Sequence, residues 1–310
     1  DARLIEEVPL AVVKAAMASG VATRPIEDLE AYRTKLHSYI SGSRLFIQST
    51  IELARKNPAR IAYAEGENDD VLLAMQAVVD EKVARPILVG RPSVIQAKIE
   101  KMGLRIKVGQ DVDIFNVEEG DLDEKYWRRY HSRVGRAGVS VEAAKTAVHT
   151  SSTVLAALLV DLGEADGMIC GKVGRFDEHL KHLTDIFNPQ RDSGLLSSVC
   201  ALLLEDGPLV LADPFVNVNP TAEEIVGIAK DAIEFARGFN IEPKVALLSH
   251  SNFGTYEDSS ALKMKKAAAI LRAEFPDLQI DGEMHSLSAL NPKLRATICE
   301  DNGIEGRANI

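Results

Sequence analysis

Short apolar runs alternate with amphipathic segments over residues 60–102, and this alternation limits the possible folds more than any other feature of the chain. Residues 60–64 and 85–89 have the length and composition of buried strands, whereas residues 71–82 and 93–102 carry apolar positions at helical spacing. Two strand–helix pairs within about 45 residues favour a parallel sheet covered by helices. We therefore predict an α/β fold.

The rest of the chain continues this pattern. We expect strands at residues 167–170, 197–204, 208–212, 245–248 and 278–281, and helices at residues 125–135, 140–162, 176–187, 220–238, 259–274 and 286–300. The strand at 167–170 is expected to be buried, and Glu205-Asp-Gly207 is a hairpin signal. Residues 109–124 are expected to form an acidic loop, and residues 306–310 resemble the start of another strand.

The organisation along the chain suggests three regions. Residues 1–43 lack a predicted strand. They contain a connector with Gly and Pro, followed by a charged amphipathic helix at 27–39, which is typical of a linker or docking arm. Residues 44–185 and 186–310 are expected to form two subdomains. Because the chain begins with Asp1 and ends at the start of a strand, we expect a fragment whose C-terminal segment is missing.

Composition excludes several classes of protein. Apolar residues make up 46% of the 310 residues, so intrinsic disorder over most of the chain is excluded. The net charge of −10 disfavours general binding to nucleic acid. No apolar run approaches the roughly 18–20 residues that span a bilayer, and no signal peptide opens the chain. We expect a cytoplasmic protein without membrane or nucleic-acid partners, in which the three cysteines are buried, reduced thiols.

A basic cluster at residues 125–136 opposes the acidic background. Arg129, Arg133 and Arg136 follow the i, i+4, i+7 spacing of one helix face, until Gly135 loosens the helix. Three guanidinium groups on one face could hold a ligand with several phosphates. Alternatively, they form a solvated face that pairs with the acidic loop at Glu118–Glu124.

Two segments that follow predicted strands carry polar or glycine-rich sequences. Cys170–Phe176 contains two glycines with Lys172 and Arg175, at a position where open parallel sheets bind ligands, although the glycine spacing is that of neither a Walker A nor a GxGxxG loop. It could equally be an ordinary turn. The second segment could cradle a phosphate or a carbonyl through Ser249, Ser251, Asn252 and Thr255. A catalytic Ser/His pair is disfavoured there, because neighbours on an extended segment point apart.

Two further groups stay open. His179 and His182 are spaced i, i+3, with Asp185 one turn on, which fits a metal site or a solvent-facing polar stripe. Asp213 follows a strand and is a functional carboxylate or a turn residue.

Taken together, the ordered motifs of residues 44–310 resemble those of the phosphotransacetylase family. The resemblance rests on Tyr63-Ala-Glu-Gly-Glu67, Ala84-Arg-Pro-Ile-Leu-Val-Gly-Arg91, Gly163-Glu-Ala-Asp-Gly-Met168 with Gly171, Leu211-Ala-Asp213, Pro220-Thr-Ala-Glu-Glu224, Val245-Ala-Leu-Leu-Ser-His-Ser251, Asp281-Gly-Glu283 and Gly306-Arg307-Ala308. The arm at residues 1–26 is similar to the end of the catalytic domain and the linker of bacterial NADP-dependent malic enzymes, which carry such a domain at their C-terminus.

The resemblance implies two Rossmann-like, parallel-sheet-based subdomains with a cleft between them, a dimer of the domain, and a hexamer or larger homo-oligomer for the whole enzyme. It also implies acetyl-CoA as an allosteric ligand. We expect acetyl-CoA to contact Arg129, Arg133, Arg136, Lys172, Arg175, Ser249, Ser251, Asn252, Thr255 and Arg307. NADP and Mg²⁺ or Mn²⁺ would belong to the malic enzyme domain, and this chain would hold no metal.

Transacetylase activity is not expected from the resemblance, and we assign no catalytic residue. Active members tend to have Thr-Thr-Ala-Asp where this chain has Arg175-Phe-Asp-Glu178, and their Ser-Arg-Gly segment would lie beyond Ile310. The expected function is regulatory: acetyl-CoA binding inhibits the oxidative decarboxylation of malate to pyruvate, and the domain promotes oligomerisation. The alternatives are an active phosphate acetyltransferase, which makes acetyl-CoA from acetyl phosphate and CoA, and a module that only assembles the oligomer.

Overall fold

The computed structural model describes residues 3–22, 24–26, 28–30, 32, 43–117, 124–187, 195–204 and 207–310. It divides the chain into two compact units: unit 2 is residues 51–196, and unit 1 combines residues 1–50 with residues 197–310. The boundaries predicted from the sequence were 43/44 and 185/186. The amphipathic helix predicted at 27–39 lies mostly outside the described residues.

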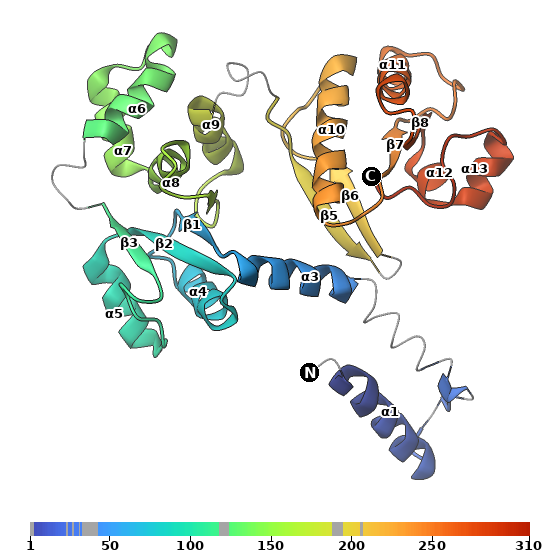
Figure 1. Ribbon diagram of the computed structural model, residues 1–310, viewed down its shortest axis with the longest axis horizontal. Coiled ribbons are helices and arrows are strands. Elements are labelled where there is room, and N and C mark those ends of the chain that lie inside the picture. Colours follow the sequence, from blue (N-terminus) through green and yellow to red (C-terminus); the bar gives the residue numbers. More distant parts are fainter. Residues whose placement is uncertain are drawn as a thin grey trace. The chain divides into compact units, whose positions relative to one another are not determined.

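Unit 2 is built on a four-stranded parallel sheet. Its strands are β1 (Ala59–Tyr63), β2 (Ala84–Gly90), β3 (Asp113–Asn116) and β4 (Gly167–Ile169), in the order β3-β2-β1-β4. Figure 1 shows this sheet between two groups of helices. The α/β class and the parallel sheet are confirmed.

Two sequence predictions about this sheet are wrong. The segment 109–124 is not all loop, because β3 lies inside it and pairs with the open edge of β2. The strand at 167–170 is not buried: β4 is an edge strand, and Ile169 is 54% exposed.

Alternating side chains on the central strands supply two separate cores. Tyr63 and Leu88 face α4 (Asp69–Glu81) and α5 (Pro92–Met102), where they pack with Leu72, Met75, Ile95 and Ile99. Ala62, Ala64 and Val89 face the opposite side and pack with the helices that follow β3. This period-2 alternation is what a sheet covered on both faces requires.

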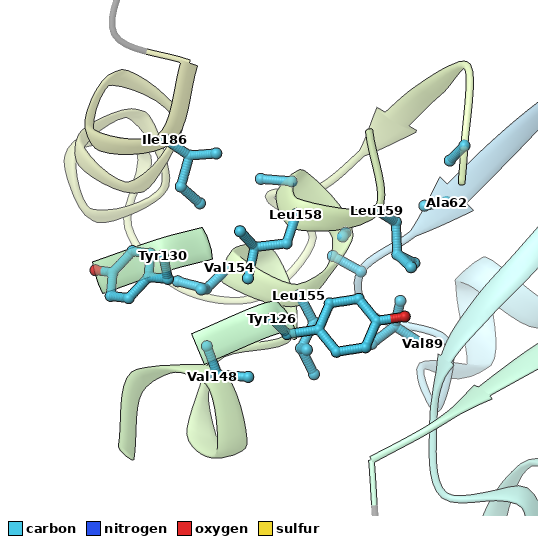
Figure 2. Packing of buried hydrophobic residues seen from close by; sticks show 14 of the residues in the cluster. Ala62, Val89, Tyr126, Tyr130, Val148, Val154, Leu155, Leu158, Leu159 and Ile186 are labelled. Carbon is cyan, nitrogen blue, oxygen red and sulfur yellow. The ribbon is translucent and has the colours of Figure 1, made fainter. Parts of the chain in front are cut away.

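The second face is covered by α6 (Glu124–Val134), the 3-10 turn η1 (Gly135–Ala137), α7 (Val141–Thr150), α8 (Ser152–Asp161) and α9 (Phe176–Phe187). Helix α8 is the centre of this layer, since seven consecutive residues, Thr153–Leu159, are buried. Figure 2 shows Val154, Leu155, Leu158 and Leu159 of this helix within the apolar cluster. The stretch predicted to be helical at 140–162 is broken at Ser151, whose hydroxyl accepts from the Val154 N–H and begins α8.

Among the described residues, no single helix is long and apolar enough to cross a membrane, and only the pair α7 and α8, bent by 102°, meets the criteria of length and composition together. The three cysteines form no disulfide and are half-buried rather than buried. Trp127, the one tryptophan of the sequence, lies on α6. The Arg128 guanidinium carbon is 4.7 Å from the centroid of its ring, and the Lys145 ammonium is 5.2 Å from it.

Unit 1 contains α1 (Arg3–Ala18), and α3 (Ser43–Lys56) runs across the division at residue 50. Its C-terminal part contains the antiparallel hairpin of β5 (Val199–Leu204) and β6 (Gly207–Ala212) and the parallel pair of β7 (Lys244–Leu248) and β8 (Gln279–Met284). The helices are α10 (Ala222–Gly238), α11 (Ser259–Glu274), α12 (Ser286–Leu290) and α13 (Pro292–Ile298).

The predicted hairpin and the helices at 220–238 and 259–274 are confirmed. Thr221 and Glu224 form a reciprocal capping box that begins α10. Helices α10 and α11 pack on β7 and β8 through an apolar core that includes Ile233, Val245, Leu271 and Ile280. The helix predicted at 286–300 is broken at Asn291, which caps α13.

Residues 309–310 hydrogen bond to both β6 and β7. The Val210 N–H donates to the Asn309 carbonyl, and the Ala246 N–H donates to the Ile310 carbonyl. The Ile310 N–H in turn donates to the Lys244 carbonyl. These bonds have the pattern of a parallel strand beside β7, in line with the strand start predicted at 306–310.

Candidate functional site

A cavity of about 410 Å³ lies at the C-terminal edge of the parallel sheet in unit 2. Its walls come from the segments that follow β1, β2 and β3, from the junction of α7 and α8, and from the glycine-containing loop after β4. The lining residues are Ala64, Glu65, Gly66, Glu67, Asn68, Val89, Gly90, Lys98, Val117, His149, Thr150, Ser152, Leu155 and Val173. Open parallel sheets characteristically bind ligands at this edge.

Two glycines allow the floor of this cavity to form. A Cβ at Gly66 would lie 2.8 Å from the carbonyl oxygen of Val89, and the Gly66 N–H donates to that same oxygen at 3.2 Å. A Cβ at Gly90 would lie 2.9 Å from Cγ of Glu67. The ends of β1 and β2 therefore approach more closely than any side chain would permit.

The charged residues at the floor are arranged in ion pairs. Arg91 donates to the Glu67 carboxylate at 2.9 and 2.7 Å, and this hydrogen-bonded guanidinium holds the pKa of Glu67 below its ordinary value. The Lys98 ammonium donates to the Glu67 carbonyl at 2.7 Å and to the Asp69 carboxylate at 2.6 Å. The Lys98 side chain is thereby held in place on the cavity wall.

Two helices begin at the cavity. Asn68 caps α4 by accepting from the Asp70 and Val71 N–H groups, and Ser151 caps α8 next to the lining residue Ser152. The N-terminal ends of helices favour anions because of the helix dipole and the unpaired N–H groups. Val89, Val117, Leu155 and Val173 supply an apolar wall. The cavity thus suits a ligand with an anionic end and an apolar arm.

We define the glycine loop as residues 171–175. The Gly171 N–H donates to the Glu65 carboxylate at 2.8 Å, and the Lys172 ammonium lies 2.6 Å from the Asp70 carboxylate. Val173 lines the cavity, and Arg175 pairs with Asp177 at 2.8 Å. Both cations are about half exposed or more, so their ion pairs are weak and open to exchange for a ligand's phosphate.

Two arginines of the predicted basic helix face form ion pairs with a buried carboxylate. Arg129 and Arg133 donate to the Asp161 carboxylate, at 2.5 and 2.7 Å, and only 6% of the Asp161 side chain is exposed. Burial alone would raise the pKa of Asp161, but hydrogen bonds from the two guanidiniums outweigh it and hold the pKa below its ordinary value. Asp161 is therefore a shared partner of Arg129 and Arg133, and Arg128 of the same cluster pairs with Glu124, the last residue of the predicted acidic loop. Residues 118–123 of that loop lie outside the described residues.

Asp161 also places these arginines away from the cavity. It is the last residue of α8, whereas the cavity is at the first residue, Ser152, roughly 14 Å away along the helix. Arg136 lies in η1, is exposed, and has no ion-pair partner within the described part of the chain. The three arginines do not converge on the cavity of unit 2.

The serine loop, residues 249–255, belongs to unit 1, and its polar side chains form hydrogen bonds within the loop and to neighbouring residues of the same unit. Ser251 is fully buried, and its hydroxyl donates to the Glu283 carboxylate at 2.8 Å, which also accepts from the Gly254 N–H. The Thr255 hydroxyl accepts from the Asn252 N–H at 3.0 Å. The Asn252 side-chain oxygen accepts from the His285 N–H and the Ser288 hydroxyl, and Ser249 accepts from the Ser251 N–H.

Arg307 lies at the other end of β7 from this loop. It lines a cavity of about 370 Å³ with Lys244, which begins β7, and Gly207, which begins β6. The serine loop follows Leu248, the last residue of β7. The predicted set within unit 1 is therefore divided between the two ends of one strand.

The histidine pair forms neither of the two arrangements that the sequence suggested. His179 is hydrogen bonded within unit 2, to Thr153 and to the Val173 carbonyl. Nδ1 of His182 is buried without a hydrogen-bond partner in the described structure, and burial lowers the pKa of this side chain. In the part of the chain that the structure describes, no group of three or more His, Cys, Asp or Glu side chains could hold a metal ion.

Asp213 is a turn residue. Its carboxylate accepts hydrogen bonds from the Ser198 hydroxyl and from the N–H groups of Val216 and Asn217. These bonds fix the segment that leads from β6 toward α10. Burial alone would raise the pKa of Asp213, but the hydrogen bonds hold the pKa below its ordinary value.

Comparison with protein families decides the relationship. Residues 45–310 match the Phosphate acetyl/butaryl transferase family. The chain belongs to this family. Two solved phosphotransacetylase structures share its fold: EutD phosphotransacetylase from Staphylococcus aureus (TM-score 0.74, 20% identity, 87% of this chain and 81% of that chain) and a phosphotransacetylase from Streptococcus pyogenes (TM-score 0.70, 26% identity, 86% and 80%).

Relatives of this phosphotransacetylase-like domain include larger proteins. The chain is 44% identical over 310 residues to the NADP-dependent malic enzyme of Salmonella typhimurium, of which it covers 41%, and similarly to that of Escherichia coli. It is 28% identical over 284 residues to the phosphate acetyltransferase of Synechocystis, covering 92% of this chain and 40% of the relative. The chain thus spans about two fifths of the length of these relatives.

Sequence reasoning missed most of the cavity of this phosphotransacetylase-like domain. Of the ten predicted residues, only Lys172 and Arg175 flank it, whereas Glu65, Asn68, Lys98, His149 and Ser152 line it. The segment after β1, residues 65–68, could have been predicted as part of a ligand site, because it follows a predicted strand in the same way as the glycine loop does. Nothing in the local sequence marks His149 or Ser152, which reach the cavity through the bend between α7 and α8.

Proposed function

We propose that this chain is a regulatory acetyl-CoA-binding domain of an enzyme that oxidatively decarboxylates malate to pyruvate with NADP, and that it does not itself transfer acetyl groups. One observation carries this proposal. The similarity to malic enzymes extends over all 310 residues, including residues 1–44, which the transferase family does not match. A domain attached to another enzyme in this way is suited to signalling rather than to a second, unrelated reaction.

The chemistry of acetyl-CoA fits the cavity of unit 2. Its phosphates need cations and N–H donors, which Lys98, Lys172, Arg175 and the first turn of α8 offer. Its acyl-pantetheine arm needs an apolar wall, which Val89, Val117 and Leu155 offer. In this proposal Arg129 and Arg133 are structural, since they neutralise Asp161.

Calorimetric titration of the 310-residue chain with acetyl-CoA tests the binding. We expect saturable binding that Lys172→Ala and Arg175→Ala each weaken about tenfold, the equivalent of one charge-assisted hydrogen bond. Arg128→Ala is the control, because Arg128 is also an exposed arginine in an ion pair, with Glu124 on α6. Absence of binding to the wild-type chain, or equal loss in all three variants, contradicts the proposal.

Regulation requires the whole enzyme. An effector changes activity only by binding two states differently, typically by about 1–3 kcal/mol. In the proposed role acetyl-CoA inhibits malate oxidation by the whole enzyme, and Arg175→Ala should raise the concentration needed for inhibition without changing the uninhibited rate. Malate oxidation that is indifferent to acetyl-CoA would exclude a regulatory role even if the ligand binds.

The family and the phosphate acetyltransferases among its relatives favour one second candidate, an active transferase. Such a domain would form acetyl-CoA and phosphate from CoA and acetyl phosphate. Thioester formation by the intact protein, followed at 232 nm or by mass spectrometry on the order of minutes, would support this candidate. A domain that assembles as a homo-oligomer and binds no CoA ester would instead be an assembly module, which sizing with and without acetyl-CoA reveals.

A further inference from the structure

His179 joins two segments that line the cavity of unit 2. Nε2 of its ring is 2.8 Å from the carbonyl oxygen of Val173, in the glycine loop. Nδ1 is 2.9 Å from the hydroxyl of Thr153, which is buried in α8 with 4% of its surface exposed. Val173 itself lines the cavity, and so does Ser152, the neighbour of Thr153. One imidazole thus spans the gap between the loop and the central helix.

The chemistry of the two hydrogen bonds fixes the orientation of the ring. A carbonyl oxygen can only accept, so Nε2 carries the proton and donates to Val173. The Thr153 hydroxyl can donate or accept, so Nδ1 is satisfied whether or not it is protonated. Neither ring nitrogen remains available for a ligand, which means that any effect of His179 on binding passes through the loop.

Gly174 makes a third contact with the same ring. It has φ +108°, and a Cβ at this position would lie 2.9 Å from Nε2 of His179. The backbone of the glycine loop therefore rests against the imidazole, at a distance that only glycine permits. The loop cannot shift toward α8 without displacing the ring.

The other tethers of the loop lie nearer to solvent. The Gly171 N–H reaches the half-buried Glu65, and Lys172 reaches the exposed Asp70. Exposed ion pairs contribute little to order. The anchor with a buried end is the one through His179 and Thr153, and a buried hydrogen-bonded group holds its geometry because breaking the bond leaves it unpaired.

We propose that His179 is a positioning residue, which fixes the glycine loop in the conformation that presents Lys172, Val173 and Arg175 to a ligand of the cavity. The ligand class is an acyl thioester with a phosphate-bearing nucleotide end, so this inference rests on the proposed function. His179 does not touch the ligand. It excludes the many loop conformations that would otherwise compete with the binding geometry, and thereby raises affinity.

Two substitutions separate the two hydrogen bonds. The amide nitrogen of glutamine reaches the position of Nε2, so His179→Gln keeps the donor for Val173. The amide of asparagine reaches only the position of Nδ1, so His179→Asn keeps the partner of Thr153 and releases the loop. Thr153→Val removes the inner anchor and leaves the ring in place.

Amide hydrogen exchange of the 310-residue chain without ligand tests the anchor. His179→Asn should raise exchange in residues 171–175 roughly tenfold, with α10 of unit 1 unchanged, whereas His179→Gln should leave loop exchange within about twofold of the wild type. Thr153→Val should behave like His179→Gln, because each variant loses only the inner hydrogen bond. Equal exchange in the asparagine variant and the wild type overturns the proposal.

Titration of the same variants with acetyl-CoA tests the consequence. We expect about tenfold weaker binding for His179→Asn and recovery to within about twofold for His179→Gln. If loop exchange rises in the asparagine variant but affinity does not fall, the positioning role is overturned. If the wild-type chain binds no acetyl-CoA while the exchange pattern holds, the proposed function fails and the anchor of the loop stands.

Discussion

The glycine loop of unit 2 and the serine loop of unit 1 both follow a strand of a parallel pair, yet they satisfy their polar groups in opposite ways. The serine loop hydrogen bonds to itself and to the buried Glu283, which leaves Ser251 no exposed surface. The glycine loop has few side chains and is held from outside, by Glu65 and His179, while its own cations stay exposed. The polar groups of the serine loop are thus engaged within unit 1, whereas the cations of the glycine loop remain accessible to solvent.

The largest effect should follow loss of the inner acceptor of the serine loop. Glu283 is 2% exposed and accepts hydrogen bonds from Ser251 and Gly254. Glu283→Ala should lower the free energy of unfolding by about 3 kcal/mol, because it leaves these donors without their buried acceptor. The matched change in unit 2, Glu65→Ala, should cost less than about 1 kcal/mol, since its bond to Gly171 is near solvent. Urea unfolding measures both. If both substitutions lower the free energy of unfolding equally, the two loops do not differ in how deeply their acceptors are buried.

Glycine substitutions should sharpen the contrast in a second way. Gly174→Ala should destabilise by about 2 kcal/mol, because it combines a positive φ with the contact on His179. Gly254→Ala in the serine loop also has a positive φ, but a Cβ there meets nothing within 4 Å, so about 1 kcal/mol is expected. Only the first change should weaken acetyl-CoA binding. Thermal unfolding and titration of both variants provide the comparison.

Acid should loosen the serine loop. Burial alone would raise the pKa of Glu283, but hydrogen bonds from Gly254 and Ser251 hold it below its ordinary value. A carboxyl group with a lowered folded-state pKa contributes stability above its ordinary pKa and loses it as the pH falls through the folded-state value. The stability gap between wild type and Glu283→Gln should thus be present at pH 6 and shrink at acidic pH. If the difference in unfolding free energy between wild type and Glu283→Gln instead grows as the pH falls, the pKa of Glu283 is raised in the folded state rather than lowered.

The smallest effect on stability is expected for the exposed cations of the glycine loop. Lys172→Ala removes a half-exposed ion pair with Asp70 and should change the free energy of unfolding by no more than about 0.5 kcal/mol. Acetyl-CoA affinity should nevertheless fall, as described above. A substantial loss of stability would mean that this lysine holds the loop rather than the ligand.

Much of the fold could be predicted from periodicity, because most elements bury one face. Helices α9 and α11 begin and end where their apolar spacing indicated, at 176–187 and 259–274. Strand β3 could not be predicted in this way: Asp113-Ile-Phe-Asn116 is short and half polar, and the open edge of β2 makes it a strand. The bend at Ser151 falls in the polar run His149-Thr-Ser-Ser-Thr153, and the apolar spacing of residues 141–148 and 154–160 around this run would suit one continuous helix equally well.

The site was less predictable than the fold, because partners distant in sequence decide what a charged residue does. Arg133, which the sequence predicts to bind a phosphate group, pairs instead with Asp161, 28 residues away in the sequence. This ion pair makes Arg133 part of the packing of unit 2. His179 is similar: its spacing to His182 suggests a metal site, whereas its partners are a threonine 26 residues earlier and a carbonyl six residues earlier. Local sequence contains neither relation.

The single tryptophan of the chain gives unit 2 an optical signature that unit 1 lacks. Trp127 lies on α6, with Arg128 and Lys145 near its ring, so its fluorescence depends on the packing of α6 against α7. Far-ultraviolet circular dichroism, by contrast, follows the helices of both units. If fluorescence and dichroism change at the same denaturant concentration, the units unfold as one cooperative system, and separated midpoints mean that each melts on its own.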